Sequence, residues 1–172
     1  MLVEAGGMVM GRLSDKDSRI LVVDDDKEVA DMMVTFLTRV GYHASAAYGG
    51  KEGVARFLEG DYQLVLLDLK MPDMDGLEAL EIFKATQPQV AVIMVTGAGT
   101  IESAVASIKA GAYDFITKPL DFKSLEMVVE RALERHGLIK QRGIFRGLAI
   151  ALLISVPLWL VLGILLARLV FN

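Results

Sequence analysis

Five polar residues in this sequence stand at the ends of short apolar runs, and their types suit the handling of a phosphoryl group. Asp24 and Asp25 close the first run, Asp68 closes the third, Thr96 closes the fourth and Lys118 follows the fifth. A carboxylate held at a fixed position can attack phosphorus, and a hydroxyl with an ammonium can bind the oxygens of the transferred group. The set therefore predicts a phosphoryl acceptor, with Asp68 as nucleophile and Thr96 and Lys118 as oxygen ligands.

The same set predicts a metal. Three carboxylates that meet at one point repel one another, and a hard divalent cation offsets that repulsion. Mg²⁺ takes oxygen ligands and keeps its remaining positions for water and phosphate. We therefore expect Mg²⁺ as the cofactor, held by Asp24, Asp25 and Asp68.

These residues meet only if the chain forms a parallel sheet. From residue 19 to about residue 138, short apolar runs alternate with longer segments of helical period, which is typical of a parallel sheet covered on both faces by helices. All strands of such a sheet end at one edge, where ligands bind. The expected strands, all buried, span residues 20–24, 42–46, 63–68, 90–96 and 113–117. The expected helices span residues 27–39, 50–58, 76–85, 100–110 and 122–136.

Several residues mark the ends and faces of these helices. Asp26, just before the first helix, is best interpreted as an N-cap. Gly41, Gly60 and Gly111 follow helices at points where a left-handed cap is expected. Three- and four-residue spacing predicts a core-facing stripe in the last helix, made by Leu125, Val128, Val129, Ala132 and Leu133.

Four stretches together resemble the signature regions of response-regulator receiver domains. They are residues 20–26 (ILVVDDD), 66–76 (LLDLKMPDMDG), 92–97 (VIMVTG) and 115–119 (FITKP), in the order and at the separations usual in that family. The resemblance covers roughly residues 19–138. It implies an α/β fold of the flavodoxin-like, doubly wound type, in which five parallel strands in the order 2-1-3-4-5 are flanked by five helices.

Carried over by position, the resemblance assigns roles to individual residues. It implies that Asp68 is the phosphoacceptor, and that Asp24 and Asp25 form an acidic pair. It also implies that Asp25 and the backbone carbonyl of Lys70 help to hold Mg²⁺.

The resemblance further implies a cis peptide bond between Lys118 and Pro119, which would aim the lysine into the crevice. In this family the phosphoryl group is coupled first to the residue at the position of Thr96 and then to an aromatic residue, which here is Phe115. Phe115 lacks the hydroxyl of the tyrosine often found at that position, so any hydrogen bond from it is lost. Considered alone, Phe115 would be interpreted as a core residue.

Composition limits the partners and the compartment. The chain has 18 Lys and Arg against 22 Asp and Glu, a formal net charge of −4, which gives no electrostatic reason to expect nucleic acid. It has no cysteine, which excludes disulfides and thiolate chemistry. Residues 1–18 lack the features of a secretory signal and are expected to be a disordered leader before a receiver domain at 19–138.

The C-terminal segment is far more apolar than the rest. Residues 147–167 are 21 consecutive residues without a charge, and a helix of that length spans about 31 Å, the thickness of the hydrocarbon core of a bilayer. We expect a transmembrane helix at 147–169, after a basic juxtamembrane linker at 139–146. Arg135, Lys140, Arg142 and Arg146 precede the span and Arg168 follows it, so the positive-inside rule predicts a tail-anchored protein with a cytoplasmic receiver.

Other interpretations of the tail remain open. It could be a buried helix in an oligomer core, or the remnant of a lost output domain. Gly143, Gly147, Ala151 and Ser155 repeat every four residues, a small-residue face compatible with a homodimer.

Three functions compete. The first is a receiver that is phosphorylated by a histidine kinase or phosphotransfer protein, has no enzymatic output domain, and acts by protein contacts at the membrane. The second is an aspartate-nucleophile phosphatase of the haloacid-dehalogenase type, suggested by Asp24-x-Asp26, although Glu28 stands where Thr or Val is wanted. The third is a membrane scaffold that is never phosphorylated, and the charge repulsion expected at the predicted site would have no use in it.

Overall fold

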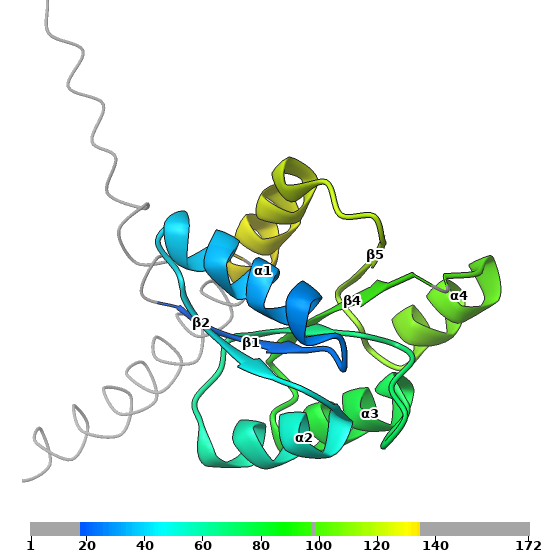
Figure 1. The fold of residues 1–172 in the computed structure, drawn as a ribbon. Helices are drawn as coiled ribbons and strands as arrows, with labels where there is room; N and C mark the ends of the chain where they lie inside the picture. Colours follow the sequence, from blue (N-terminus) through cyan, green and yellow to red (C-terminus); the bar gives the residue numbers. More distant parts are fainter. Residues whose placement is uncertain (1–17, 98, 135–172) are drawn as a thin grey trace, which may run out of the picture. The chain divides into compact units, whose positions relative to one another are not determined.

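A computed structural model describes residues 18–97 and 99–134, which form a five-stranded sheet with helices on both faces (Figure 1). The strands are β1 (Arg19–Val23), β2 (His43–Ala47), β3 (Leu64–Leu67), β4 (Ala91–Thr96) and β5 (Asp114–Thr117). The helices are α1 (Lys27–Arg39), α2 (Gly50–Glu59), α3 (Gly76–Thr86), α4 (Ile101–Lys109) and a final helix over residues 122–134. All strand pairs are parallel and the order is β2-β1-β3-β4-β5, which confirms the predicted topology.

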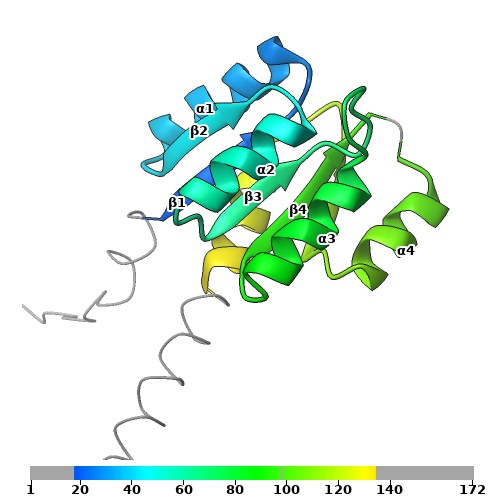
Figure 2. The ribbon, with the colours of Figure 1, turned by 90° about the horizontal axis from the view of Figure 1, so that it is seen from below.

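The sheet separates two apolar cores, because successive side chains of a strand point to opposite faces. Ile20 and Val22 belong to one core, with α1 and the final helix, whereas Leu21 and Val23 belong to the other, with α2 and α3. Figure 2 shows α2 and α3 lying over the second face. The predicted stripe of the final helix is confirmed by burial at Leu125, Val128, Val129, Ala132 and Leu133.

The expectation that all five strands are buried is wrong for the two at the sheet edges. β3 and β4 are buried at every position, but three of the five residues of β2 and three of the four residues of β5 are only half-buried. Each edge strand has a neighbour on one side only, so helices cover it less completely.

The three glycines that were predicted to cap helices adopt two different backbone conformations. Gly41 and Gly111 have φ of 104° and 99°, so they form the predicted left-handed caps after α1 and α4. The same prediction is wrong at Gly60, whose φ is −110°. A Cβ at Gly60 would collide with the ring of Tyr62, so the glycine there leaves room for an aromatic side chain.

Another close approach predicts a measurable loss of stability. A Cβ at Gly53 would lie 2.6 Å from a methyl group of Val23, and both residues are buried between α2 and β1. Gly53→Ala should therefore lower the free energy of unfolding by about 1–3 kcal/mol through overpacking. Chemical denaturation would measure the change. Gly97→Ala is the matched control, because among the described residues other than its chain neighbours the nearest atom to its Cβ would be the Cβ of Lys118, at 3.9 Å. Equal stabilities of the two variants would contradict this account of the packing.

Some predictions concern parts of the chain outside the described residues. These are the leader before residue 18, the basic linker at 139–146 and the membrane span at 147–169. Within residues 18–97 and 99–134, no helix combines the length and apolarity needed to cross a bilayer.

Candidate functional site

Backbone hydrogen bonds bring the strand ends to one edge of the sheet. The N–H of Asp68 donates to the carbonyl of Val23 at 2.8 Å, which places the end of β3 beside the end of β1. The N–H of Lys118 donates to the carbonyl of Thr96 at 2.9 Å, which places the residue after β5 beside the end of β4. Segments that lie 94 residues apart in the sequence, at Asp24 and Lys118, thus reach the same edge.

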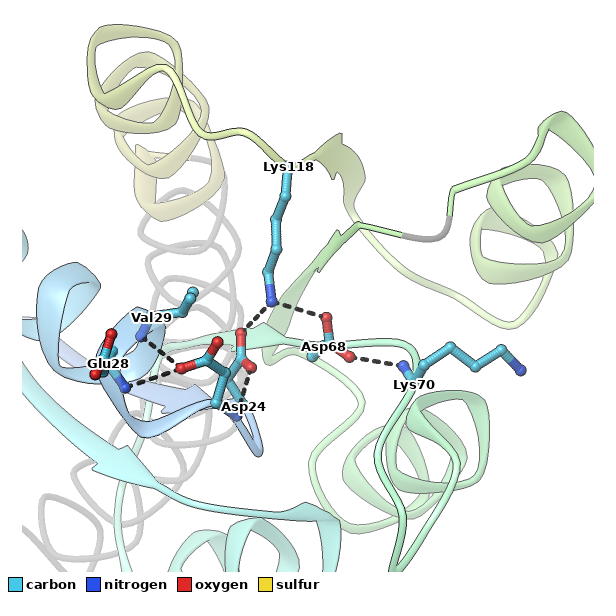
Figure 3. Close-up of polar contacts among 7 residues, drawn as sticks. Asp24, Glu28, Val29, Asp68, Lys70 and Lys118 are labelled. Atoms are coloured by element: carbon cyan, nitrogen blue, oxygen red, sulfur yellow. Dashed lines mark hydrogen bonds and ion pairs between the residues drawn. The ribbon is translucent and has the colours of Figure 1, made fainter.

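Lys118 joins the two buried carboxylates of this edge (Figure 3). Its ammonium donates to Oδ2 of Asp24 at 2.6 Å and forms an ion pair with Oδ1 of Asp68 at 3.1 Å. Asp24 is 1% exposed and Asp68 is 5% exposed, so both carboxylates need such partners. The predicted meeting of Asp24, Asp68 and Lys118 is therefore present in the structure.

The remaining oxygens of the two carboxylates accept backbone hydrogen bonds. The N–H of Lys70 donates to Oδ2 of Asp68 at 2.7 Å, and the N–H of Asp26 donates to Oδ1 of Asp24 at 3.1 Å. Each carboxylate is thus held by one backbone amide and one ammonium contact. This arrangement fixes the orientation of Asp68 before any ligand arrives.

Burial and their mutual attraction set the pKa values of Asp24 and Lys118. Burial raises the pKa of Asp24, and the hydrogen bond and charge of Lys118 offset that rise only in part. For Lys118, burial alone would lower the pKa, but the hydrogen bond and charge of Asp24, with a contribution from Asp68, outweigh it and raise the pKa above its usual value. Lys118 therefore stays charged wherever the protein is folded near neutral pH.

The predicted metal ligands are only partly assembled. Among the described residues, no group of three Asp, Glu or His side chains is placed to hold one ion. Asp24 and Asp68 share the Lys118 ammonium, whereas Asp25, which follows Asp24 in the sequence, is exposed. The donors still fit Mg²⁺ chemically, since they are oxygens with an excess of negative charge beside a solvent-facing carboxylate.

The predicted switch residues lie on the neighbouring strands β4 and β5. Thr96 is 1% exposed at the end of β4. Phe115, in β5, is half-buried and packs against the core on the α2–α3 side of the sheet. A Cβ at Gly99 would lie 2.9 Å from the Phe115 ring, so the backbone at Gly99 lies close to the edge of that ring. The peptide bond between Lys118 and Pro119 is cis.

Asp26 has the capping role that the sequence favoured. Its carboxylate accepts hydrogen bonds from the N–H groups of Glu28 and Val29 at 3.0 and 3.3 Å, at the start of α1. The dehalogenase-type alternative needs this carboxylate as an acid-base group facing the nucleophile. Its use as a helix cap disfavours that alternative.

Sequence reasoning missed two carboxylates of the loop after β3. Asp75 caps α3 by accepting from the N–H of Leu77 at 2.9 Å, and a helix-capping aspartate before Gly76 could have been recognised from the sequence. Asp73 accepts from the N–H groups of Gly50 and Lys51, at the start of α2. No local pattern reveals Asp73, because its partners lie more than twenty residues away.

Comparisons with known proteins agree with this geometry. The family model described as the response regulator receiver domain matches residues 20–130. The chain is 37% identical over 126 residues to the transcriptional regulatory protein ZraR of Salmonella typhimurium, covering 73% of this chain and 27% of ZraR. It is 41% identical over 117 residues to the nitrogen assimilation regulatory protein NtrX of Azorhizobium caulinodans, covering 67% of this chain and 26% of NtrX.

Solved structures give the same result. A CheY-like receiver domain protein from Methanospirillum hungatei has a TM-score of 0.68 and 36% identity, covering 70% of this chain and 97% of that protein. The chain spans about a quarter of the length of the ZraR and NtrX proteins it matches, in agreement with a match to one domain of each. The family match, the sheet order and the joined carboxylates together lead to one conclusion: the chain belongs to the response regulator receiver domain family.

Proposed function

We propose that the chain accepts a phosphoryl group on Asp68, and that this group is donated by a histidine kinase or a phosphotransfer protein. The observation that carries the proposal is the Lys118 ammonium, which contacts both Asp24 and Asp68 at the common edge of the strands. A buried carboxylate with a fixed orientation beside a cation is suited to attack on phosphorus and to binding the charge that is transferred.

The proposed step balances as a simple displacement. An oxygen of Asp68 forms a bond to phosphorus while the bond from phosphorus to the donor breaks, and its electron pair leaves with the donor. Asp68 becomes an acyl phosphate. Lys118 and Thr96 contact the oxygens of the transferred group, Lys118 by its ammonium and Thr96 by its hydroxyl.

Mg²⁺ is part of the proposal. Asp24, Asp25, Asp68 and the backbone carbonyl of Lys70 would hold it, and when bound it would offset the charge that phosphate adds to an acidic site. Support comes from the charge imbalance of the site, where two buried carboxylates share one ammonium.

The signal would pass from the phosphoryl group to Thr96 and then to Phe115. Phe115 is half-buried and its ring lies close to the backbone at Gly99, so a shift of Gly99 would alter the room for the ring. Without a hydroxyl, Phe115 would respond through packing alone. A related receiver, DrrB, with a TM-score of 0.64 and 32% identity, was solved in a state activated by BeF3.

Phosphoryl transfer to the full-length protein tests the central proposal. The protein, in detergent micelles with Mg²⁺ and acetyl phosphate, should gain one base-labile phosphoryl group, and peptide mapping by mass spectrometry should place it on Asp68. An adduct on another residue, or no adduct, would reject the proposal.

We also propose that the chain is anchored in the cytoplasmic membrane by residues 147–169, with the receiver domain on the cytoplasmic side and its effector partner close to the membrane. The uncharged stretch and the basic residues before it support this. Extraction of membranes with alkaline carbonate provides the test. We expect the full-length protein to stay in the pellet, and a variant with Arg in place of Leu152 and Leu160 to move largely to the supernatant, because each central Arg costs about 2.5–3.5 kcal/mol on insertion. Release of the unaltered protein would contradict the anchor.

A further inference from the structure

The start of α2 is capped by a residue from another part of the chain. Its N-cap, Gly49, has no side chain to accept a hydrogen bond. The N–H groups of Gly50 and Lys51 instead donate to the two carboxylate oxygens of Asp73, each at 3.0 Å. Both bonds satisfy helix amides that would otherwise have no partner within the helix. The loop between β3 and α3 is therefore tied to α2 by both oxygens of one carboxylate.

Close packing accompanies this tie. A Cβ at Gly49 would lie 3.0 Å from an oxygen of Asp73, and a Cβ at Gly50 would lie 2.7 Å from the Cβ of Met74. Because Gly49 and Gly50 have no side chains, the start of α2 packs directly against the loop. The contact leaves little space in which the middle of the loop could shift.

The same loop supplies a hydrogen bond to the proposed phosphoacceptor. Three positions before Asp73, the N–H of Lys70 donates to Oδ2 of Asp68 at 2.7 Å. Pro72 stands between the two residues and has a fixed φ, which removes conformational freedom from the connecting backbone. A displacement of Asp73 should consequently reach the Lys70 amide.

We propose that Asp73 is a positioning residue for phosphoryl acceptance: by clamping the β3–α3 loop to α2, it holds the Lys70 amide on Asp68. The inference rests on the proposed function of Asp68. With Oδ2 occupied by this amide and Oδ1 beside Lys118, the carboxylate has one defined orientation for attack. Loss of such orientation slows a reaction even where the reacting group itself is intact.

Two variants at this position and one matched control test the inference in the full-length protein in detergent micelles. Asp73→Ala removes both acceptors, and Asp73→Asn keeps one. The control is Asp121→Ala, since Asp121 also accepts two helix amides, from Lys123 and Ser124 at 3.3 and 3.2 Å, but is not part of the β3–α3 loop.

The rate of phosphorylation by acetyl phosphate should separate these variants. We expect Asp73→Ala to react about tenfold more slowly than Asp121→Ala, with Asp73→Asn between them, because small displacements at a reacting group cost up to about a hundredfold. Thermal denaturation checks that the compared variants are folded. Equal rates for Asp73→Ala and Asp121→Ala would overturn the inference and leave the proposed function standing, whereas an unaltered protein that accepts no phosphoryl group would overturn both.

The amide resonance of Lys70 gives a second readout that does not depend on phosphorylation. A short hydrogen bond to a carboxylate moves an amide proton downfield, so both Asp73 variants should shift the Lys70 resonance upfield in a two-dimensional NMR spectrum, and Asp121→Ala should leave it in place. A Lys70 resonance that is unchanged in Asp73→Asn and Asp73→Ala would overturn the clamp. This measurement also distinguishes a displaced loop from a general loss of stability.

Discussion

Asp68→Asn should reduce phosphoryl transfer to background, a loss of at least about a thousandfold, which is the scale seen when a nucleophile is removed. The amide has nearly the shape of the carboxylate but cannot form an acyl phosphate. Mass spectrometry after incubation with acetyl phosphate and Mg²⁺ would measure the loss. The matched control is Asp61→Asn, which makes the same chemical change at an exposed residue before β3.

The fold should survive this substitution. Lys118 keeps its 2.6 Å hydrogen bond to Asp24, and the repulsion between Asp24 and Asp68 disappears. Circular dichroism spectra of the two variants should therefore match that of the unaltered protein. An adduct that forms on Asp68→Asn at the original rate would show that another residue is the acceptor.

Lys118→Met should slow phosphorylation by about 100- to 1,000-fold, the usual cost of removing one preorganised donor to developing charge. Lys118 is the ammonium that the structure places at the end of β5, in contact with both buried carboxylates. Time courses of adduct formation would give the rate constants. Lys109→Met, which removes an exposed lysine from α4, serves as control and should react like the unaltered protein.

The ion pairs of Lys118 also make the stability of the protein depend on pH. The pKa of Lys118 is raised in the folded protein, so the stability contributed by its charge is complete below its ordinary pKa of about 10.5 and is lost as the pH rises through the higher folded value. Unfolding by urea across pH 8–12 should show a decline above about pH 10.5 that is steeper in the unaltered protein than in Lys118→Met. Parallel curves for the two proteins would contradict the ion pair.

Much of the fold was predictable because local signals and topology agreed. The helix over residues 27–39 has the predicted bounds, since Asp26 caps its start and Gly41 follows its end. The topology followed from parallel strands joined by helices. The partial exposure of β2 and β5 was not predicted, although polar residues mark both strands: His43 and Ser45 lie in β2 and Asp114 lies in β5, whereas β3 is apolar throughout.

The candidate site was predictable as a set of residues but not as a set of contacts. Strand ends identified Asp24, Asp68 and Lys118, since a parallel sheet gathers its strand ends at one edge. The sequence did not reveal that Lys118 would contact both carboxylates, nor that Asp25 would be exposed. Those outcomes depend on side-chain reach across the sheet. Asp73 was missed for a related reason, because its partners belong to another helix.

The complete burial of β3 and β4 has a consequence for how the sheet aligns itself. Apart from Thr96, β3 and β4 consist of apolar residues, so sliding one strand past the other mostly exchanges one apolar residue for another, and hydrophobicity alone opposes such slippage weakly. A shifted register would instead move Asp68 or Thr96 from the edge of the sheet into its apolar interior, where a polar group without hydrogen-bond partners is costly. The residues that would perform the chemistry thus also favour one strand register during folding.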